Sequence, residues 1–215
     1  MSSSRVYAGQ SAEHRVEARR RALLDAGLEL LGTRGWSATT VRGICTEAGL
    51  TARFFYESFA GLDELAVAVF DEIATDATLA VTTAVAAADG GRRARALAAI
   101  DAGVRALTDD PRRARVVFVE ALGSEPLMRR RMRTMTALSE VIAGYGREDY
   151  APPAAAEPLL RVTAGLLAGG MAELLIAWID GALDVTREEL VADCADLFVG
   201  VGDAARTIAE RRGHL

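Results

Sequence analysis

The chain has 215 residues, of which 51% are hydrophobic, enough to fill the core of one large domain or two small ones. Its net charge of −5 argues against a general polyanion-binding protein. The charge is uneven, because residues 1–62 carry eight Arg and six acidic residues while the rest is acidic. This asymmetry fits contact with DNA at one end of the chain only.

The basic side chains and the cysteines indicate which phosphate contacts and which cellular compartment to expect. Lys is absent, so contacts with phosphate have to come from Arg, hydroxyls and backbone amides. Cys45 and Cys194 lie in apolar helical patterns and are predicted to be buried free thiols in a reducing cytosol. The polar N-terminus lacks a signal sequence, and no uncharged apolar run approaches the ~20 residues that span a bilayer. We therefore expect a cytoplasmic protein without a membrane partner.

The first helical pattern follows a polar arm. Residues 1–11 are expected to lack regular structure. Apolar residues spaced by three and four predict a helix over residues 12–31. Its first half carries four arginines, which form either a solvated face or a clamp for DNA phosphates, namely Arg15, Arg19, Arg20 and Arg21.

The most informative stretch is Thr39 to Phe59. Thr39 or Thr40 can cap a short helix, and Gly49 stands where that helix has to end, since glycine adopts the left-handed conformation readily. A second helix over residues 52–59 would bury Phe55 and Phe59. Two short helices joined by a glycine turn indicate a helix-turn-helix, although a helical corner inside a core has the same pattern.

The remaining patterns are helical, and no strand pattern competes with them. Helices are predicted from about 61 to 89, over 92–108 and 111–123, from 126 to about 149, and over 159–180 and 187–210. We expect an all-α protein of about nine helices, with the helix-turn-helix near the N-terminus and a helical bundle after it. The predicted boundary separates residues 1–62, the arm and helix-turn-helix, from residues 63–215, the helical body.

With these residues in place, the chain resembles the TetR family of transcriptional regulators. The match covers about fifty residues at Ala26–Leu31, Gly35–Val41, Ile44–Thr51, Phe55–Phe59 and Asp63–Leu65. The resemblance implies that residues 1–62 form the N-terminal arm and a three-helix DNA-binding head. It also implies that residues 63–215 form a six-helix ligand-binding and dimerisation domain, which dimerises through its last two long helices and holds a small-molecule pocket.

The resemblance also implies roles for residues of the helix-turn-helix. Thr40 and Tyr56 would contact phosphate, and Arg53 would pair with guanine O6 and N7. Two departures matter: Leu62 replaces a lysine common in the family, and Phe54 replaces a hydroxyl. Phosphate affinity would fall or shift to other residues, and Phe54 could pack on a thymine methyl. The predicted DNA-binding residues are Thr40, Arg42, Thr51, Ala52, Arg53, Phe54, Tyr56 and Ser58.

Candidate sites in the body are less specific. The candidates for ligand binding are Phe70, Phe118, Met132, Met135, Glu173 and Trp178, each of which could equally be ordinary core. Glu173, in an apolar stretch, would be a buried carboxylate that orients a ligand or pairs with an arginine across a dimer. Interior glycines and an apolar seam predict the dimer interface, with the residues Gly165, Gly169, Leu190, Cys194, Leu197, Val201 and Ile208.

These observations predict a ligand-responsive transcriptional regulator, a repressor that binds a palindromic operator as a homodimer and is released by a small molecule. The alternatives are a sensor of the same fold with weak or lost DNA binding, and an all-helical enzyme. Catalysis is not expected, because His14 and His214 lack partners at metal spacing and no nucleotide-binding motif is found. No metal or cofactor is expected, and the ligand, the operator and the choice between repressor and activator stay open.

Overall fold

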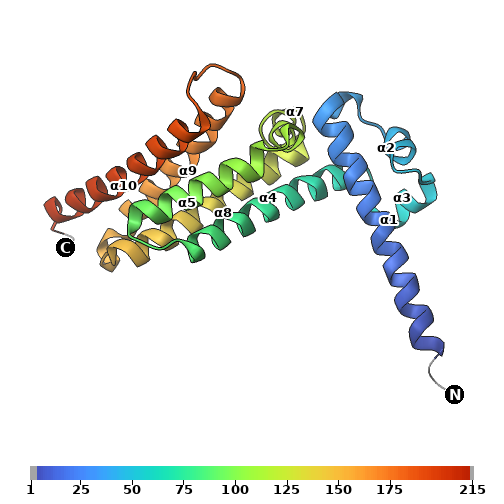
Figure 1. The fold of residues 1–215 in the computed structure, drawn as a ribbon, viewed down its shortest axis with the longest axis horizontal. Coiled ribbons are helices and arrows are strands. Elements are labelled where there is room, and N and C mark those ends of the chain that lie inside the picture. Colours follow the sequence, from blue (N-terminus) through green and yellow to red (C-terminus); the bar gives the residue numbers. More distant parts are fainter. Residues whose placement is uncertain (1–3, 214–215) are drawn as a thin grey trace. The chain divides into compact units, whose positions relative to one another are not determined.

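The computed structural model describes residues 4–213, with side chains from Glu13 onward. The described residues form helices and no strand, which confirms the all-α prediction, and there are nine helices when α6, η2 and α7 are counted as one (Figure 1). The count of nine leaves out the short 3-10 helices η1 and η3. In chain order the elements are α1 (Ser4–Arg34), η1 (Trp36–Ala38), α2 (Val41–Glu47), α3 (Ala52–Ser58), α4 (Leu62–Ala87), α5 (Arg92–Thr108), α6 (Pro111–Ala114), η2 (Arg115–Glu120), α7 (Ala121–Gly123), α8 (Glu125–Tyr150), η3 (Ala154–Ala156), α9 (Glu157–Ile179) and α10 (Arg187–Arg211).

The first helix is longer than predicted. It begins at Ser4 rather than at residue 12, so the expectation of an arm without regular structure is wrong from Ser4 onward. The reason is that adding a residue to an existing helix costs little once the costly first turn has formed. Residues 1–3 of the predicted arm and His214 lie outside the described residues.

By packing, the chain forms two compact units. Unit 1 contains the residues up to Ile73 together with Asp110–Arg130, and unit 2 contains Ala74–Asp109 and Arg131 onward. The division at residue 62 assigned functions to two parts of the chain, and it stays a prediction. The segment from α6 to α7 packs in the same unit as the helix-turn-helix, although about fifty residues, which include α4 and α5, separate the two in sequence.

The core of unit 1 joins α1, α2, α3 and the start of α4. Leu31, Ile44 and Phe55 are fully buried there, as is Leu65. Gly27 of α1 has no room for a larger residue, because an added Cβ would lie 2.8 Å from Val69 Cγ2. A small residue on α1 therefore allows α4 to pack closely against it.

The segment from α6 to α7 differs from the single α-helix predicted for residues 111–123. Residues 115–120 form a π-helix, η2, in the middle of it. Val116, Val117 and Phe118 are buried, but Val119 and Leu122 are about half exposed, so the segment is less central than its apolar sequence indicated.

α6 contacts the end of α1 at closest range beside Gly32. An added Cβ at Gly32 would lie 2.8 Å from the Cα atom of Arg112. The Arg112 guanidinium then bridges the two helices, because its Nη1 donates to Glu29 on α1 at 2.7 Å and its Nη2 donates to Asp110 at 2.7 Å. The hydrogen bonds from Arg112 hold the pKa of Asp110 below its ordinary value.

A buried carboxylate joins η2 to the turn before α2. Glu120, 9% exposed, accepts a hydrogen bond from the backbone N–H of Trp36 at 2.7 Å and another from Arg115 Nε at 2.9 Å. Arg115 Nη1 also donates to the carbonyl of Thr33 at 3.2 Å. Gly35 is required at this point, since its φ is 82° and an added Cβ would lie 2.9 Å from the Glu120 carboxylate.

Unit 2 is built around α5, α9 and α10. α10 packs along α5, and α9 contacts α10 (Figure 1). The buried face of α9 consists mostly of small residues, Ala164, Ala168 and Ala172, so neighbouring helices can approach closely. α10 begins with a capping box, in which the Thr186 hydroxyl accepts from the backbone N–H of Glu189 and the Glu189 carboxylate accepts from the backbone N–H of Thr186.

We expect Glu120→Gln to lower the free energy of unfolding by about 1–3 kcal/mol, because charge-assisted hydrogen bonds in a buried site are lost. Glu120→Leu should cost more, about 3–5 kcal/mol, because Arg115 and the Trp36 N–H lose their shared acceptor. Denaturant titration followed by circular dichroism measures both changes.

Glu125→Gln is the matched control, since the Glu125 side chain is 74% exposed and its loss should change the free energy by less than about 0.5 kcal/mol. Equal unfolding midpoints for Glu120→Gln and Glu125→Gln would contradict the structural role of Glu120.

Candidate nucleic-acid interface

The first helix of the helix-turn-helix is capped as its sequence predicts. Of the two candidate caps, Thr40 stands at the N-cap position of α2, and its hydroxyl accepts from the backbone N–H of Gly43 at 3.1 Å. Thr39 is buried and donates to the carbonyl of Gly35 at 2.7 Å. Gly49 ends α2 with a φ of 64°, the left-handed conformation predicted for it.

The second helix, α3, has one buried face and one exposed face. Phe55 and Phe59 are buried, as predicted. The rings of Phe55 and Tyr56 pack edge to face, with their centroids 5.3 Å apart. Thr51 stands at the N-cap position without a side-chain cap hydrogen bond. The exposed face contains four of the predicted DNA-binding residues, Thr51, Ala52, Arg53 and Tyr56.

Two arginines of α1 contact α3 and the residue that follows it. The Arg19 guanidinium lies over the ring of Phe54 at 4.4 Å, and that of Arg20 lies over the ring of Phe59 at 4.4 Å. Arg20 Nη1 also donates to the carbonyl of Ser58 at 3.1 Å. Such cation–π contacts stabilise by about 0.5–2 kcal/mol each, depending on burial, so both arginines help to fix the direction of α3.

These contacts bear on three sequence-based expectations. Arg19 and Arg20 contact α3, so they are not a simple solvated face, and Arg21 pairs with Asp25 and Glu72. A clamp for DNA phosphates stays a prediction. Phe54 is half-buried beneath Arg19, which does not favour its packing on a thymine methyl. Those roles could not be read from the sequence, because they depend on how α1 crosses α3.

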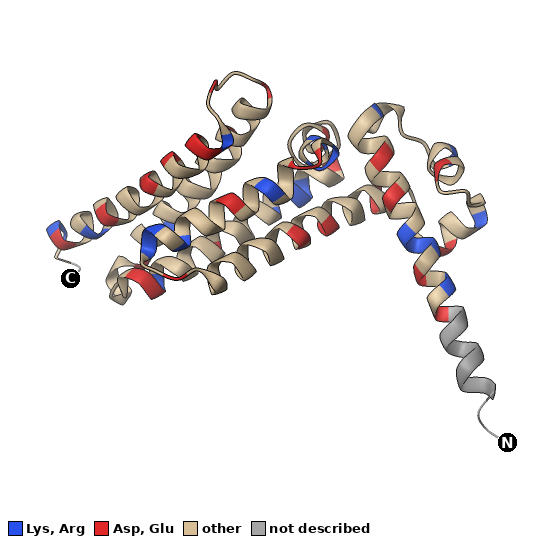
Figure 2. Cartoon of the chain, in the orientation of Figure 1, with Lys and Arg blue, Asp and Glu red and all other residues tan. Residues whose placement is uncertain are grey.

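The exposed surface of α2 and α3 carries both signs of charge (Figure 2). Its basic residues are Arg42 and Arg53, and its acidic residues are Glu47 and Glu57, so the formal charges cancel. Arg53, 84% exposed, donates from Nε to the Glu57 carboxylate at 2.9 Å. The sequence analysis did not select Glu57, although its spacing of four residues from Arg53 on a predicted helix was a usable signal.

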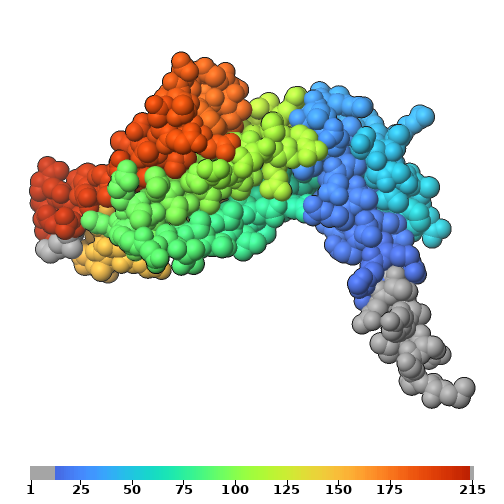
Figure 3. Space-filling view, viewed as in Figure 1, coloured from blue at the N-terminus to red at the C-terminus, as the bar shows by residue number. Residues whose placement is uncertain are grey.

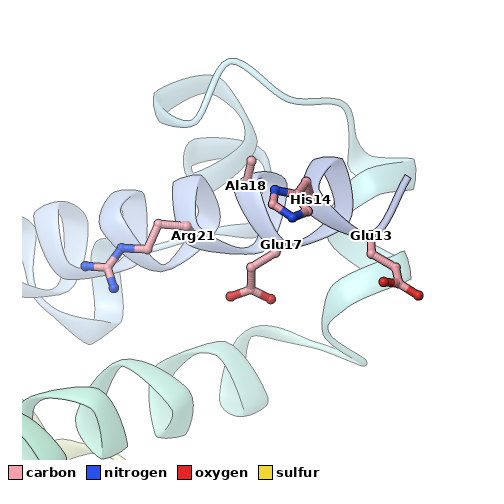
Figure 4. Close-up of a pocket in the computed structure, with 5 residues that line it drawn as sticks. All are labelled: Glu13, His14, Glu17, Ala18 and Arg21. Atoms are coloured by element: carbon pink, nitrogen blue, oxygen red, sulfur yellow. The ribbon is translucent and has the colours of Figure 1, made fainter. Parts of the chain in front are cut away.

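A hollow of about 450 Å³ lies on α1 (Figure 4). Its lining comes entirely from α1, with the side chains of Glu13, His14, Glu17, Ala18 and Arg21. All five residues are exposed, and none belongs to the predicted DNA-binding set. The hollow is therefore an open part of the helix surface.

The candidate ligand-binding residues are distributed over both units. Phe70 and Phe118 are buried in unit 1. In unit 2, Met132 is 66% exposed, Met135 is partly buried, and Trp178 is partly buried with its indole N–H donating to the carbonyl of Val185 at 2.8 Å. Their roles in ligand binding stay predictions.

Glu173 differs from the buried carboxylate that its apolar neighbours indicated. Its side chain is 75% exposed and lies 3.6 Å from an Nη atom of Arg131 in the same chain. The reason is its position on α9, where it shares the outward face with Gly169, Gly170 and Leu174. Burial of Glu173 is therefore corrected, and the charge partner in the described chain is Arg131.

The predicted dimer-interface residues separate into three groups by exposure. Leu190 and Cys194 are 4% and 3% exposed, so they belong to the core of unit 2 in the single chain. Leu197 is 60% exposed, and Gly165 and Gly169 lie on an exposed face of α9. Val201 and Ile208 are partly buried.

α9 is unusually apolar on the surface that it exposes. By length and composition, residues 154–179 could cross a membrane, which the sequence analysis did not expect, and 22% of the apolar window is buried inside the chain. Val162 and Leu166 are 67% and 64% exposed. This face thus presents large apolar side chains and glycines, together with the charged side chains of Arg161 and Glu173.

Both cysteines are free and buried, as predicted. Burial raises the pKa of the Cys45 thiol and that of the Cys194 thiol, so both thiols resist ionisation. In the part of the chain that the structure describes, no group of three His, Cys, Asp or Glu residues could hold a metal ion.

Known proteins identify the fold and the N-terminal segment. Residues 23–69 match the family described as bacterial regulatory proteins, tetR family. No curated protein sequence matches the chain. Among solved structures, the chain is similar to a predicted transcriptional regulator from Pseudomonas aeruginosa PAO1, with a TM-score of 0.72, 20% identity, and coverage of 91% of this chain and 94% of the other.

Two further similar structures are of regulators named FadR. FadR from Bacillus halodurans, a fatty acid degradation regulator, has a TM-score of 0.69 and 16% identity, with coverage of 85% of this chain and 95% of the other. FadR from Bacillus subtilis, in complex with stearoyl-CoA, has a TM-score of 0.69 and 15% identity, with coverage of 83% and 97%. Identities this low show a shared fold, whereas the match at residues 23–69 confirms the resemblance to TetR-family regulators.

Proposed function

We propose that this chain, which combines a TetR-family helix-turn-helix segment with a TetR-like fold, is a ligand-responsive transcriptional repressor. It would bind a palindromic operator as a homodimer and leave it when a small molecule binds to the body. The observation that carries this proposal is the exposed face of α3, where Arg53 and Tyr56 point away from a core that holds Phe55 and Phe59.

A helix supported in this way has the properties required to enter the major groove. Its inner face is fixed by aromatic burial and by Arg19 and Arg20 of α1, while its outer side chains remain accessible. In such motifs the second helix contacts base edges, and phosphate contacts from the flanking residues set its register. Thr40, Arg42 and Tyr56 are our candidates for phosphate contacts.

One observation favours the second candidate, a sensor with weak or lost DNA binding. The exposed charges of α2 and α3 cancel, and Leu62 stands where the family often has a lysine. Non-specific affinity for DNA depends on positive charge facing phosphate, so a neutral surface gives little of it. DNA binding by this chain would therefore rely on base contacts.

Selection of bound DNA from a random pool distinguishes the two candidates. We expect the enriched sequences to share an inverted repeat whose half-sites are separated by about one turn of DNA or more, roughly 34–36 Å, as dimeric helix-turn-helix proteins require. A pool without any enriched motif would leave the sensor as the better description.

Tyr56→Phe then tests the placement of α3. Loss of one phosphate hydrogen bond should weaken binding to the selected operator and to unrelated DNA by a similar factor, roughly two- to tenfold. Tyr145→Phe, on α8, is the control and should bind like the wild type. If the two variants bind equally, the Tyr56 hydroxyl makes no hydrogen bond to phosphate.

The effector is proposed to be a molecule with a long apolar part, which would bind to residues 63–215. The support is the shared fold with FadR from Bacillus subtilis, which was crystallised with stearoyl-CoA. A ligand shifts an equilibrium only by its differential affinity for the two states, so the effector has to prefer the form that does not bind the operator.

Gel-shift titration with stearoyl-CoA tests this class of effector. Micromolar stearoyl-CoA should release the operator, whereas free coenzyme A should not, because it lacks the acyl chain. An operator affinity that is the same with both compounds would exclude acyl-CoA as the effector class.

The homodimer is proposed to form through the exposed face of α9 and the adjoining part of α10. α10 lies along α5 on the face drawn in Figure 3, and α9 contacts α10. Val162, Leu166 and Leu197 are at least 60% exposed, and burial of such side chains between two chains would remove them from water. Gly165 and Gly169 would let the facing helices approach closely.

We expect Leu197→Glu to dissociate the dimer, because a buried carboxylate without a partner costs several kcal/mol. Sedimentation measures the mass of each variant. Leu79→Glu on α4 is the matched control, since Leu79 is 64% exposed and lies outside the proposed interface. A dimer that survives Leu197→Glu would place the interface elsewhere.

The same proposal assigns the protein to the cytoplasm and excludes catalysis. Two buried free thiols fit a reducing compartment. TetR-family regulators are generally non-enzymatic DNA-binding proteins, and the function proposed here needs no cofactor.

A further inference from the structure

The ion pair between Arg53 and Glu57 is oriented against the preference of its own helix. Arg53 lies in the first turn of α3 and Glu57 in the last, one residue from the helix end. The helix dipole favours acidic residues at the start and basic residues at the end, so both positions are unfavourable. In paired residues four apart, the acidic partner is also better placed first. Helix stability therefore does not account for this pair.

The position of Glu57 is also unfavourable for DNA binding by charge alone. The Glu57 side chain is 43% exposed on the face of α3 that carries Arg53. A carboxylate near the groove is repelled by phosphates and by the acceptor atoms of guanine and thymine. It is attracted only by base edges that present an amino donor, and cytosine N4 is the partner that acidic side chains select.

We propose that Arg53 and Glu57 read the operator as a pair, in which Arg53 donates to guanine O6 and N7 and Glu57 accepts from cytosine N4. This inference rests on the proposed function, because it assigns base specificity to the same helix. The residues are four apart, so they are offset by roughly 6 Å along the helix axis. Stacked bases are about 3.4 Å apart, which places the cytosine within two base pairs of the guanine.

The hydrogen bond between Arg53 and Glu57 orients Arg53 for base recognition. Arg53 Nε donates to Glu57 at 2.9 Å, and the bonded carboxylate restrains a side chain that is otherwise 84% exposed. The other guanidinium donors stay available for the fork of two hydrogen bonds to guanine. Because Arg19 and Arg20 fix the opposite side of α3, the pair has a defined direction.

The test is selection from a random DNA pool with the full-length wild type, Glu57→Gln, Glu47→Gln and Arg53→Ala in parallel, followed by titration of single-base operator variants. Glu47→Gln is the matched control, since Glu47 is exposed on α2 and its change removes the same charge. Both glutamine variants should bind DNA that lacks the motif more tightly by a similar factor, because each removes one negative charge near phosphate.

Only Glu57→Gln should change the motif at the cytosine. Discrimination for that base, on the order of tenfold in the wild type, should fall at least fivefold or move to adenine, which glutamine can pair through N6 and N7. Arg53→Ala should lose the guanine preference. Circular dichroism confirms that each variant folds.

Four results would overturn the inference. An unchanged cytosine preference in Glu57→Gln means that Glu57 reads no base. A loss confined to the guanine in that variant means that Glu57 only positions Arg53. A wild type that enriches no motif overturns the proposed function and this inference with it, whereas an enriched motif without the guanine–cytosine pair overturns the inference alone.

Discussion

The placement of α3 depends on its packing, because a helix of seven residues is too short to be stable alone. Phe55 and Phe59 anchor it in the core of unit 1, and Arg19 and Arg20 contact it from α1. The same contacts decide which side chains face outward. The candidate DNA-binding surface is therefore a consequence of how α1 crosses α3, and its chemistry is whatever the remaining residues of α3 present.

A second constraint ties the middle of the chain to this head. Glu120 of η2 holds the backbone N–H of Trp36, and Arg112 bridges α6 to α1. Gly32 and Gly35 provide the space for both contacts. The helix-turn-helix and the segment from α6 to α7 are thus one packed unit. Any displacement of that segment would therefore also displace the turn before α2.

The two candidate interaction surfaces differ in their physical character. The exposed residues of α2 and α3 are polar with balanced charge, so they gain little from non-specific attraction to phosphate. The exposed face of α9 is apolar and rich in glycine, which suits close packing with another helix. One surface therefore depends on directional hydrogen bonds, and the other depends on removal of apolar area from water.

Local sequence signals determined the helices, their caps and the buried face of α3. Thr40, Gly49, Phe55 and the 3–4 spacing of apolar residues act within a few positions of themselves, so the structure follows them closely. Only the tertiary structure decided the roles of Arg19, Arg20 and Glu120, the exposure of Glu173 and the place of Leu190 and Cys194 in the core of the single chain. The reason is that periodicity shows which residues share a helix face, whereas the partner of that face, or its contact with solvent, depends on helices that are distant in sequence.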